Sequence, residues 1–430
     1  MSSIKASIGR YRWFICLLLF LATTVNYIDR QILALLKPIL DDQLGWTNEQ
    51  YGLINSAFQG AYAVGLLLFG VFVDRVGTKI GYAVSIAAWS VDAIGHSLVG
   101  GIGGFLRARL ALGISEGGNF PSAIKAVALW FPRKERAFAT ALFNSGANVG
   151  AIVAPAVIPW IAGAWGWRSA FVFAGIAGLC WLGLWLPFYD TPERSKRLAA
   201  DELSLIRSDV DEQASDERPL GWLAILRYRQ AYAFIVAKFL TDPVWWFFLI
   251  WLPDFFKQSR GLDIKKSWVH LVSIYAIVTV LSIIGGWLAG YLIRRGWPSN
   301  RARKVAMLIF ACAVTPVFLV TQVGLWSAVV LIGIAGAAHQ AWSANLFTTV
   351  SDMFPKRAVA SVVGIGGMAG SVGGILFPTF TGILLDRFRA SGNVTAGYAI
   401  LFVVCGSAYL LAFVIGHLLA PRFDQIKLGV

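Results

Sequence analysis

Long apolar segments, separated by short polar ones, run through almost the whole chain. A helix of about 20 apolar residues crosses the hydrocarbon core of a bilayer. Twelve segments fit this length, with approximate centres at residues 25, 62, 90, 114, 150, 177, 243, 281, 313, 337, 371 and 408. The one long polar stretch, 190–229, leaves six segments on each side. The pattern predicts an all-α polytopic membrane protein with twelve transmembrane helices. Its two six-helix halves are 1–189 and 230–430, joined by a cytoplasmic loop over 190–229.

The composition agrees with this pattern and explains the charge. The 430 residues are 57% hydrophobic and 14% charged, whereas soluble proteins carry about 25% charged residues. The net charge is +14, and most basic residues fall in the segments that a cytoplasmic N-terminus places on the inner side, as in the positive-inside rule. The basicity therefore sets the topology, with both termini cytoplasmic, and does not indicate nucleic-acid binding.

The sequence lacks the usual elements of enzymes and ATP-driven pumps. It contains no phosphate-binding loop and no nucleotide motif. The four cysteines stand singly and have neither metal-ligand nor redox spacing: Cys16, Cys180, Cys312 and Cys405. We therefore expect no enzyme activity, metal or cofactor, and a proton gradient as the driving force. The first apolar run is too long for a signal peptide and is expected to remain as the first helix.

The two halves resemble one another at a separation of about 220 residues. Phe131-Pro132 recurs as Phe354-Pro355, and Val149-Gly150 recurs as Val372-Gly373, each 223 residues later. Such a period indicates an internal structural repeat. Transporters built from paired repeats bind solute near the bilayer midplane, between the repeats, and move by rocking about this site.

The polar loop also contains a stretch, 198–210, that fits either an amphipathic surface helix or a solvated linker.

Ionisable residues occur within two of the apolar segments. Asp29 and Arg30 lie in the first, and Arg109 and Glu116 lie in the fourth. A charge at the bilayer centre costs about 2.5–3.5 kcal/mol even on insertion scales, so such residues usually bind or move something. Arg109 and Glu116 are seven residues apart, which places them on one helix face about 10.5 Å apart. The chain is therefore predicted to carry a charged solute.

These four residues suggest specific roles. A carboxylate in a partly desolvated cavity tends to take up a proton unless a cation lies near it, so Asp29 and Glu116 are the predicted proton-coupling residues. The planar guanidinium of Arg30 suits a substrate carboxylate, and Arg109 would tune the charge of Glu116 or Asp29. Three alternatives remain: the two arginines exchange roles, Arg30 is a structural partner of Asp29, or a fixed salt bridge ties the helices together.

Hydroxyl groups of a sugar need polar side chains at mid-depth. Four candidates come from the N-terminal half: Tyr27, Tyr62, Asn144 and Asn148. In the C-terminal half we favour Gln340, with His339 as a second candidate. The alternative for all of them is hydrogen bonding between helices.

The seventh segment carries a charged pair and an aromatic cluster. Lys238 and Asp242 are four residues apart on one helix face, just before Pro243. They fit an internal ion pair at a broken helix, or else Lys238 is a second anion contact. The aromatic residues 245–248 are expected to face lipid or to lie in an interfacial belt.

One loop motif carries a family resemblance. Residues 70–79, GVFVDRVGTK, resemble the signature G-x-x-x-D-R-x-G-[RK]-[RK] of the major facilitator superfamily, and Thr78 stands where a basic residue is more common. In this motif a set of small and charged residues is expected to form a conformational latch: Gly70, Asp74, Arg75, Gly77 and Lys79. The resemblance implies the twelve-helix fold of that superfamily.

Further stretches resemble one branch of the superfamily, the anion:cation symporters. They are NYIDR at 26–30, RLALGISEGGNFPS at 109–122, WFP at 130–132, KFLTDPVWW at 238–246 and AHQAWS at 338–343. The last two are most similar to bacterial hexuronate transporters, with D-galactonate transporters also close. The resemblance implies that Asp29 and Glu116 are the proton-linked pair.

The sequence thus predicts a secondary active transporter. It would couple protons to the uptake of a sugar-acid monocarboxylate, a hexuronate such as glucuronate or galacturonate, by alternating access. The alternatives are an aldonate (galactonate-type) symporter, an exchanger of organic anions or phosphate, and a membrane sensor that does not transport. The expected partners are the organic anion, protons and membrane lipid, with no nucleic acid. We expect a monomer in the bacterial inner membrane.

Overall fold

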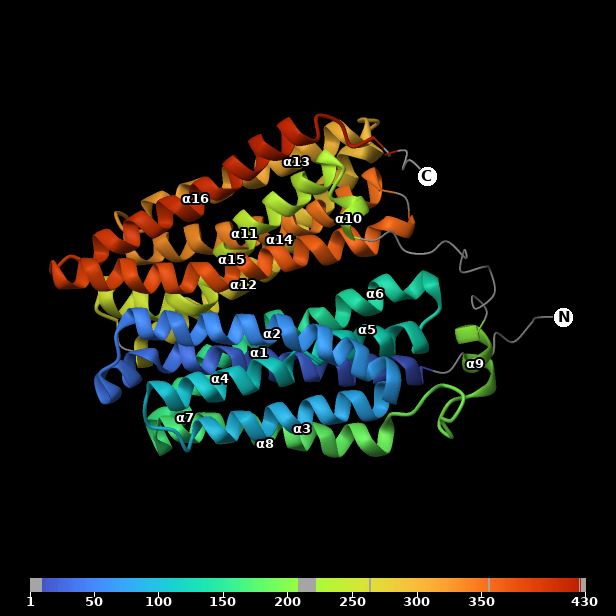
Figure 1. Cartoon of the computed structure of the whole chain (residues 1–430), viewed down its shortest axis with the longest axis horizontal. Helices are drawn as coiled ribbons and strands as arrows, with labels where there is room; N and C mark the ends of the chain where they lie inside the picture. The colour runs from blue at the N-terminus through green and yellow to red at the C-terminus, as the bar shows by residue number, and fades with distance from the viewer. Residues whose placement is uncertain (1–9, 208–221, 263, 355, 425, 427–430) are drawn as a thin grey trace. The chain divides into compact units, whose positions relative to one another are not determined.

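A computed structural model describes residues 10–207, 222–262, 264–354, 356–424 and 426 (Figure 1). These residues are almost entirely helical and contain no strand. The first half of the chain forms α1 (Tyr11–Leu44), α2 (Asn48–Val76), α3 (Thr78–His96), α4 (Ile102–Glu116), α5 (Asn119–Trp130), α6 (Arg133–Asn144), α7 (Gly146–Trp165) and α8 (Trp167–Phe188). The remainder forms α9 (Ala200–Arg207), α10 (Trp222–Ile225), α11 (Arg229–Arg260), α12 (Ile264–Arg294), α13 (Ser299–Val314), the 3₁₀ helix η1 (Thr315–Leu319), α14 (Leu325–Met353), α15 (Lys356–Ala390) and α16 (Val394–Leu419).

The helices agree with the predicted membrane segments in type and place. Each of the twelve predicted centres lies inside a helix. Within the described residues, ten helical segments are long and apolar enough to cross a membrane. α4 and α5 are each short because the chain breaks at Gly117 and Gly118. The all-α polytopic class is confirmed, and the count of twelve spans stays a prediction.

The chain divides into two compact units. Unit 1 comprises Met1–Ile32 and Ala61–Asp216, and unit 2 comprises Leu33–Gly60 and Glu217–Val430. The second part of α1 and the first part of α2 thus belong to unit 2. The internal repeat predicts a different division, because it assigns the whole of α1 and the whole of α2 to the first half, residues 1–189. That division into halves stays a prediction.

Unit 1 is built around α3, which packs against α8, α4 and α5. Tyr82 of α3 lies against Trp181 and Trp185 of α8, with ring centroids 5.2 and 5.1 Å apart. Such tilted and edge-on aromatic pairs add about 0.5–1.5 kcal/mol beyond the area that they bury. The aromatic side chains therefore hold α3 against α8, and Nε1 of Trp185 also donates a hydrogen bond of 3.1 Å to the carbonyl oxygen of Lys79 in α3.

Part of the polar central loop is a helix that docks on the start of α1. α9 covers 200–207 of the stretch for which a helix or a linker was predicted, so the helix is confirmed there; residues 208–210 lie outside the described part. Glu202 of α9 is fully buried and accepts hydrogen bonds from the backbone N–H groups of Tyr11 and Arg12, at 3.0 and 3.1 Å. A carboxylate suits this place because the first N–H groups of a helix lack intrahelical partners and carry partial positive charge.

Unit 2 is built around α11, which packs against α15 and α16, while α12 packs against α14 (Figure 1). The aromatic cluster of α11 is central to this packing. Trp245, Phe247 and Phe248 are buried, and Phe247 contacts Phe377 and Phe402. The predicted lipid-facing position of this cluster is therefore wrong, because Phe247 packs against α15 and α16 and Trp245 packs against α14.

The repeat in the sequence corresponds to the same close helix approach in each unit. A Cβ on Gly150 of α7 would lie 2.6 Å from the carbonyl oxygen of Thr24 in α1. A Cβ on Gly373 of α15, its repeat partner, would lie 2.7 Å from the carbonyl oxygen of Phe239 in α11. Small residues allow membrane helices to approach closely. Each glycine thus brings its helix against the helix that carries a charged candidate residue, Arg30 in unit 1 and Lys238 in unit 2.

Candidate functional site

The charged residues of unit 1 meet inside the helix packing. Nε of Arg30, near the middle of α1, lies 2.6 Å from Oε2 of Glu116, the last residue of α4. The side chain of Arg30 is 9% exposed and that of Glu116 is 0% exposed. Arg30 is thus an ion-pair partner of Glu116, whereas one of the alternatives from the sequence paired it with Asp29.

Asp29 and Arg109 complete this cluster. Both are 2% exposed, and the charged groups that interact electrostatically with Asp29 are Glu116, Arg109, Arg30 and Asp92. Oδ1 of Asp29 has no hydrogen-bond partner among the described residues. The four predicted residues therefore form one buried group of two acids and two bases.

Aromatic rings surround the guanidinium of Arg30. Its Cζ lies 5.3 Å from the ring centre of Tyr27 and 4.3 Å from that of Tyr62. Both are cation–π distances, so these two predicted residues lie beside the predicted clamp. Asn144 is exposed at the end of α6, and Asn148 is half-buried near the start of α7.

A second polar cluster lies in unit 2. Nζ of Lys238 lies 2.6 Å from Oδ2 of Asp242 on the next turn of α11. His339, at the middle of α14, shares a hydrogen bond of 2.6 Å between its Nδ1 and the hydroxyl of Tyr409 in α16. The His339 ring also stacks on Trp245, with centroids 5.4 Å apart. Gln340 is half-buried beside His339. The predicted ion pair is present, and His339 has a partner within the protein.

The loop motif joins α2 and α3. Gly70, Asp74 and Arg75 lie in the last turns of α2, and Gly77 between the helices has φ +87°, a conformation that favours glycine. Asp74 Oδ1 accepts a hydrogen bond of 2.7 Å from Nζ of Lys125 in α5. The motif is thus tied to α5 by an exposed ion pair, while Arg75 is exposed to solvent.

Lys79 anchors the other end of the motif. Its Nζ donates to Asp190 Oδ2 at 3.1 Å. Partial burial would raise the pKa of Asp190, but hydrogen bonds from the Thr191 N–H and from Lys79 outweigh this and lower the pKa below its ordinary value. Asp190 is therefore an anion at neutral pH and holds the start of α3 to the segment after α8.

One buried charge cluster was not predicted. Lys37 of α1 is fully buried, and its ammonium donates to Asp41 Oδ2 at 2.6 Å, Asn48 Oδ1 at 2.8 Å and Asp254 Oδ1 at 2.8 Å. Asp254 Oδ2 also accepts a hydrogen bond from the hydroxyl of Tyr398. The three donors of the ammonium all have acceptors. The cluster lies within unit 2 and fastens 33–60 to α11 and α16.

The sequence held a signal for this cluster. Lys37 interrupts an apolar run and lies seven residues after Arg30, on the same helix face. Asp92 was missed as well; its Oδ2 accepts a hydrogen bond from the Ser115 hydroxyl at 2.7 Å, next to Glu116. Both are single charged residues in apolar helices, which is the feature that identified Asp29 and Glu116.

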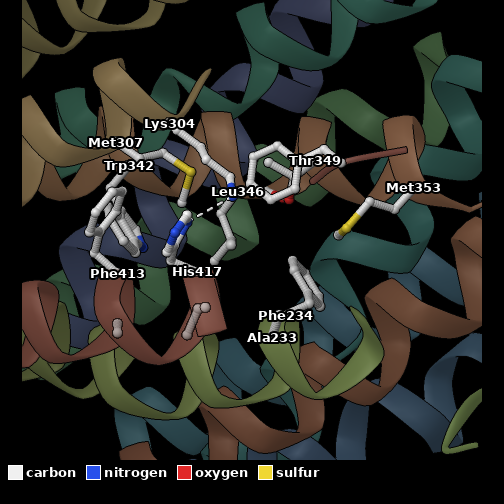
Figure 2. Close-up of a pocket in the computed structure, with 14 residues that line it drawn as sticks. Ala233, Phe234, Lys304, Met307, Trp342, Leu346, Thr349, Met353, Phe413 and His417 are labelled. Atoms are coloured by element: carbon white, nitrogen blue, oxygen red, sulfur yellow. Dashed lines mark hydrogen bonds between the residues drawn. The ribbon is translucent and has the colours of Figure 1, made fainter. Parts of the chain in front are cut away.

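A partly open pocket in unit 2 contains none of the predicted residues. It lies among α11, α13, α14 and α16 and is lined by Trp342, Met307, Phe413 and others (Figure 2). Its cavity of about 30 Å³ has room for a water molecule but not for a sugar acid. At its edge, Nζ of Lys304 contacts His417 Nδ1 and Ala420 O, both at 2.9 Å. This lysine stabilises the C-terminal end of α16, as basic groups do at helix C-termini.

Comparison with known proteins decides the family. The family model described as Major Facilitator Superfamily matches residues 19–378. The chain belongs to the Major Facilitator Superfamily. As a member it is a multi-pass membrane transporter and not an enzyme. Within the described residues, no group of three or more His, Cys, Asp or Glu side chains is placed to hold a metal ion.

Relatives in this superfamily agree with the resemblance found in the sequence. The hexuronate transporter of Escherichia coli K12 is 32% identical over 403 residues, covering 91% of this chain and 90% of the relative. A probable galactarate/D-glucarate transporter of the same organism is 27% identical over 433 residues, covering 95% of each chain. The resemblance to bacterial sugar-acid transporters is therefore confirmed.

The fold has counterparts among solved structures. The crystal structure of a bacterial homologue of the human lysosomal transporter Spinster, inward-facing and occupied, superposes with a TM-score of 0.77 at 18% sequence identity. The match covers 96% of this chain and 98% of the other. At this identity the match establishes the superfamily fold and no more.

Proposed function

We propose that this protein is a proton-coupled symporter that carries a sugar-acid monocarboxylate, a hexuronate such as glucuronate or galacturonate, into the cell. The observation that carries the proposal is the buried cluster of Asp29, Arg30, Arg109 and Glu116 in unit 1. It combines a guanidinium suited to a carboxylate with two acids that can take up protons. The similarity to the E. coli hexuronate transporter over 91% of the chain supports the substrate class.

The ion pair between Arg30 and Glu116 suggests how the proton and the solute are coupled. With Glu116 ionised, its carboxylate neutralises Arg30 at a distance of 2.6 Å. Protonation of Glu116 removes that negative charge, and the carboxylate of the sugar acid then replaces it beside the guanidinium. Proton and anion thus enter together, because neither alone leaves the cluster with balanced charge.

Charge balance favours one proton for each monocarboxylate in this exchange of partners. One proton and one monocarboxylate add no net charge to the site, so the loaded carrier brings no extra charge into the bilayer. Asp29 offers a second protonation site, and one proton on each acid would make transport electrogenic. Tyr27 and Tyr62 provide ring faces and hydroxyls beside Arg30, where the sugar ring would lie.

The proposal includes location and assembly. The protein would lie in the bacterial inner membrane as a monomer, with both termini cytoplasmic, as the distribution of basic residues favours. Alternating access would open the site to each side in turn.

Uptake by the purified protein in liposomes tests the function. Labelled glucuronate and galactonate are offered separately, with and without an inward proton gradient. We expect glucuronate to accumulate only with the gradient, by up to about tenfold per pH unit for one coupled proton. Accumulation of galactonate alone would favour an aldonate symporter, and gradient-independent countertransport would favour an anion exchanger. Absence of any flux with these anions would contradict sugar-acid transport.

Replacement of Arg30 tests the carboxylate clamp. Lysine keeps the charge but loses the planar pair of donors, so Arg30→Lys is expected to raise the apparent substrate constant about 10- to 100-fold, equivalent to a charge-assisted hydrogen bond of about 1.5–3 kcal/mol. Arg107→Lys is the control, since Arg107 is exposed on α4 and donates to its own helix. Initial rates of glucuronate uptake over a range of concentrations give both constants. Equal constants for the two variants would rule out the clamp.

A further inference from the structure

Asp92 of α3 is an acid beside the transport cluster, and the scheme above leaves it without a role. It is half-buried in an apolar helix, and its charge acts on Asp29. Both residues belong to unit 1, as do Arg30, Arg109 and Glu116. Charged residues within membrane helices are costly, so they usually bind or move something. Asp92 is therefore a candidate for a part in the proton step.

Two polar contacts tie α3 to the end of α4, where Glu116 lies. The hydroxyl of Ser85 donates to the carbonyl oxygen of Ser115 at 2.7 Å. The hydroxyl of Ser115 in turn donates to Oδ2 of Asp92, also at 2.7 Å. Ser85 and Asp92 are seven residues apart, two turns along one face of α3. Both contacts position the residue before Glu116, and the one from Asp92 also brings a charge.

The Ser115 hydroxyl suits a carboxylate at this place. Ser115 is 4% exposed, and its Oγ also lies 3.1 Å from the carbonyl oxygens of Ala111 and Leu112 in its own helix. A hydroxyl has one proton to donate, and an ionised carboxylate is a stronger acceptor than a neutral carbonyl. The side chain of Asp92 is thus held against α4 in a fixed position.

Other ionisable groups also surround α3. The helices packed against it are α4, α5 and α8, and their ionisable residues are Arg107, Arg109 and Glu116 of α4, Lys125 of α5, and Arg168 and Cys180 of α8. Three of the cations bind elsewhere: Arg107 donates to the Gly103 carbonyl, Lys125 to Asp74 and Arg168 to the Ser97 carbonyl. Cys180 is exposed. Arg109 and Glu116 are left as the groups that share the surroundings of Asp29 with Asp92.

The ionisable groups of α3 itself have partners of their own. Lys79 pairs with Asp190, and the Tyr82 hydroxyl donates to Oδ1 of Asn119. His96 is fully buried, and its Nδ1–H donates to the backbone carbonyl of Asp92 at 2.7 Å. Asp92 is therefore the residue through which α3 places a carboxylate beside the transport cluster.

We propose that Asp92 is a third acid of the proton-coupling group, whose negative charge sets the pH at which Asp29 and Glu116 take up protons. This role rests on the proposed function and adds a control on its proton step. A negative charge nearby makes a carboxylate hold a proton more readily. With Asp92 ionised, the carrier loads protons in less acidic surroundings than it would without that charge, and it therefore transports over a wider range of external pH.

The test is the pH profile of transport after removal of this charge. Asp92→Asn keeps an oxygen that accepts from Ser115 and loses the charge. Initial rates of labelled glucuronate uptake into liposomes are measured over a range of external pH. The midpoint of the profile is expected to lie about one pH unit lower in the variant, the order of effect of one charge at effective protein dielectric constants. An unchanged midpoint would overturn the proposal.

Three further variants separate the charge of Asp92 from its hydrogen bond. Asp92→Glu restores the charge and should return the midpoint to near that of the wild-type protein. Ser85→Ala removes the other contact to Ser115 without a change of charge, so it should leave the midpoint in place even if the rate falls. Asp201→Asn removes an exposed aspartate of α9 in the same unit and should not move the midpoint. A shift in any of these three as large as that of Asp92→Asn would refute a role of the Asp92 charge.

Binding without transport provides a second measure, and Asp92→Ala a second variant without the charge. Stabilisation of each purified protein by glucuronate, followed by thermal unfolding in detergent at several pH values, should show the same downward shift. If glucuronate uptake by the wild-type protein does not depend on pH, the proposed proton coupling fails. If uptake by the wild-type protein depends on pH and both neutral variants keep its midpoint, the role of Asp92 alone is refuted.

Discussion

Glu116→Gln is expected to abolish the accumulation of glucuronate against a gradient and to leave solute exchange across the membrane. Glutamine has the shape of a protonated glutamate and cannot release a proton, so the variant behaves as a permanently protonated carrier. The accumulation ratio under an inward gradient of one pH unit should fall from about tenfold to about one. Countertransport of labelled against unlabelled glucuronate, measured without a gradient, should persist.

The pH profile adds a second measure of the same variant. Uptake by the wild-type protein should rise as the external pH falls, because external protons load Glu116 and weaken its ion pair with Arg30. Exchange by Glu116→Gln should lose this part of the pH dependence. Glu193→Gln is the matched control: Glu193 is 53% exposed and lies 3.9 Å from Arg207. Accumulation by Glu116→Gln at the wild-type level would exclude Glu116 from proton coupling.

Asp29 distinguishes one coupled proton from two. If each acid carries a proton, Asp29→Asn also loses accumulation, and transport by the wild-type protein moves net positive charge inward. If Asp29 only adjusts the charge around Glu116, Asp29→Asn keeps accumulation and shifts its pH dependence. The two carboxylates interact electrostatically, so their effects are expected to be non-additive.

The helical fold was predictable because the bilayer leaves few choices. Backbone groups in lipid must be satisfied within the segment, so an apolar stretch of the required length is a helix. The repeat was predictable for a related reason: Gly150 and Gly373 permit the same close approach in each unit, and that approach does not tolerate larger residues. The division into units was not predictable, because it depends on which side chains of α1 and α2 find partners in this conformation.

Partners of the charged residues were harder to predict than the residues themselves. Successive residues on a helix point about 100° apart, so the neighbouring positions of Asp29 and Arg30 gave no guide to their contacts. Arg30 instead pairs with Glu116, 86 residues away.

The aromatic residues 245–248 were misplaced for a different reason. Composition does not distinguish a ring that faces lipid from one that faces another helix, because both environments are apolar.

The Lys37 cluster combines these difficulties, and it leads to the largest expected effect on stability. Its acceptor Asp254 lies 217 residues away in the chain, and no local pattern connects the two. Removing one member of a buried ion cluster leaves the opposite charges desolvated and unpaired, which typically costs about 3–5 kcal/mol. We therefore expect Lys37→Met, which keeps the length of the side chain, to lower the melting temperature of the purified protein strongly.

A second site and a rescue separate this effect from the general loss of a lysine. Lys257→Met removes a half-buried lysine, 28% exposed, that pairs with an Asp42 side chain 73% exposed and donates to the carbonyl of Pro38 at 2.6 Å. Because no charge is left desolvated, its loss should cost only about 1 kcal/mol. Adding Asp254→Asn to Lys37→Met removes one of the two uncompensated carboxylates and should recover part of the loss, since deletion of both partners of a buried pair is far less damaging than deletion of one. Thermal unfolding of all three variants, under one detergent condition, makes the comparison. If Lys37→Met is no less stable than Lys257→Met, the three hydrogen bonds of Lys37 do not hold 33–60 in unit 2. That part of α1 and α2 is then retained by its other contacts, such as the hydrogen bond from the Tyr51 hydroxyl to the carbonyl of Ile250.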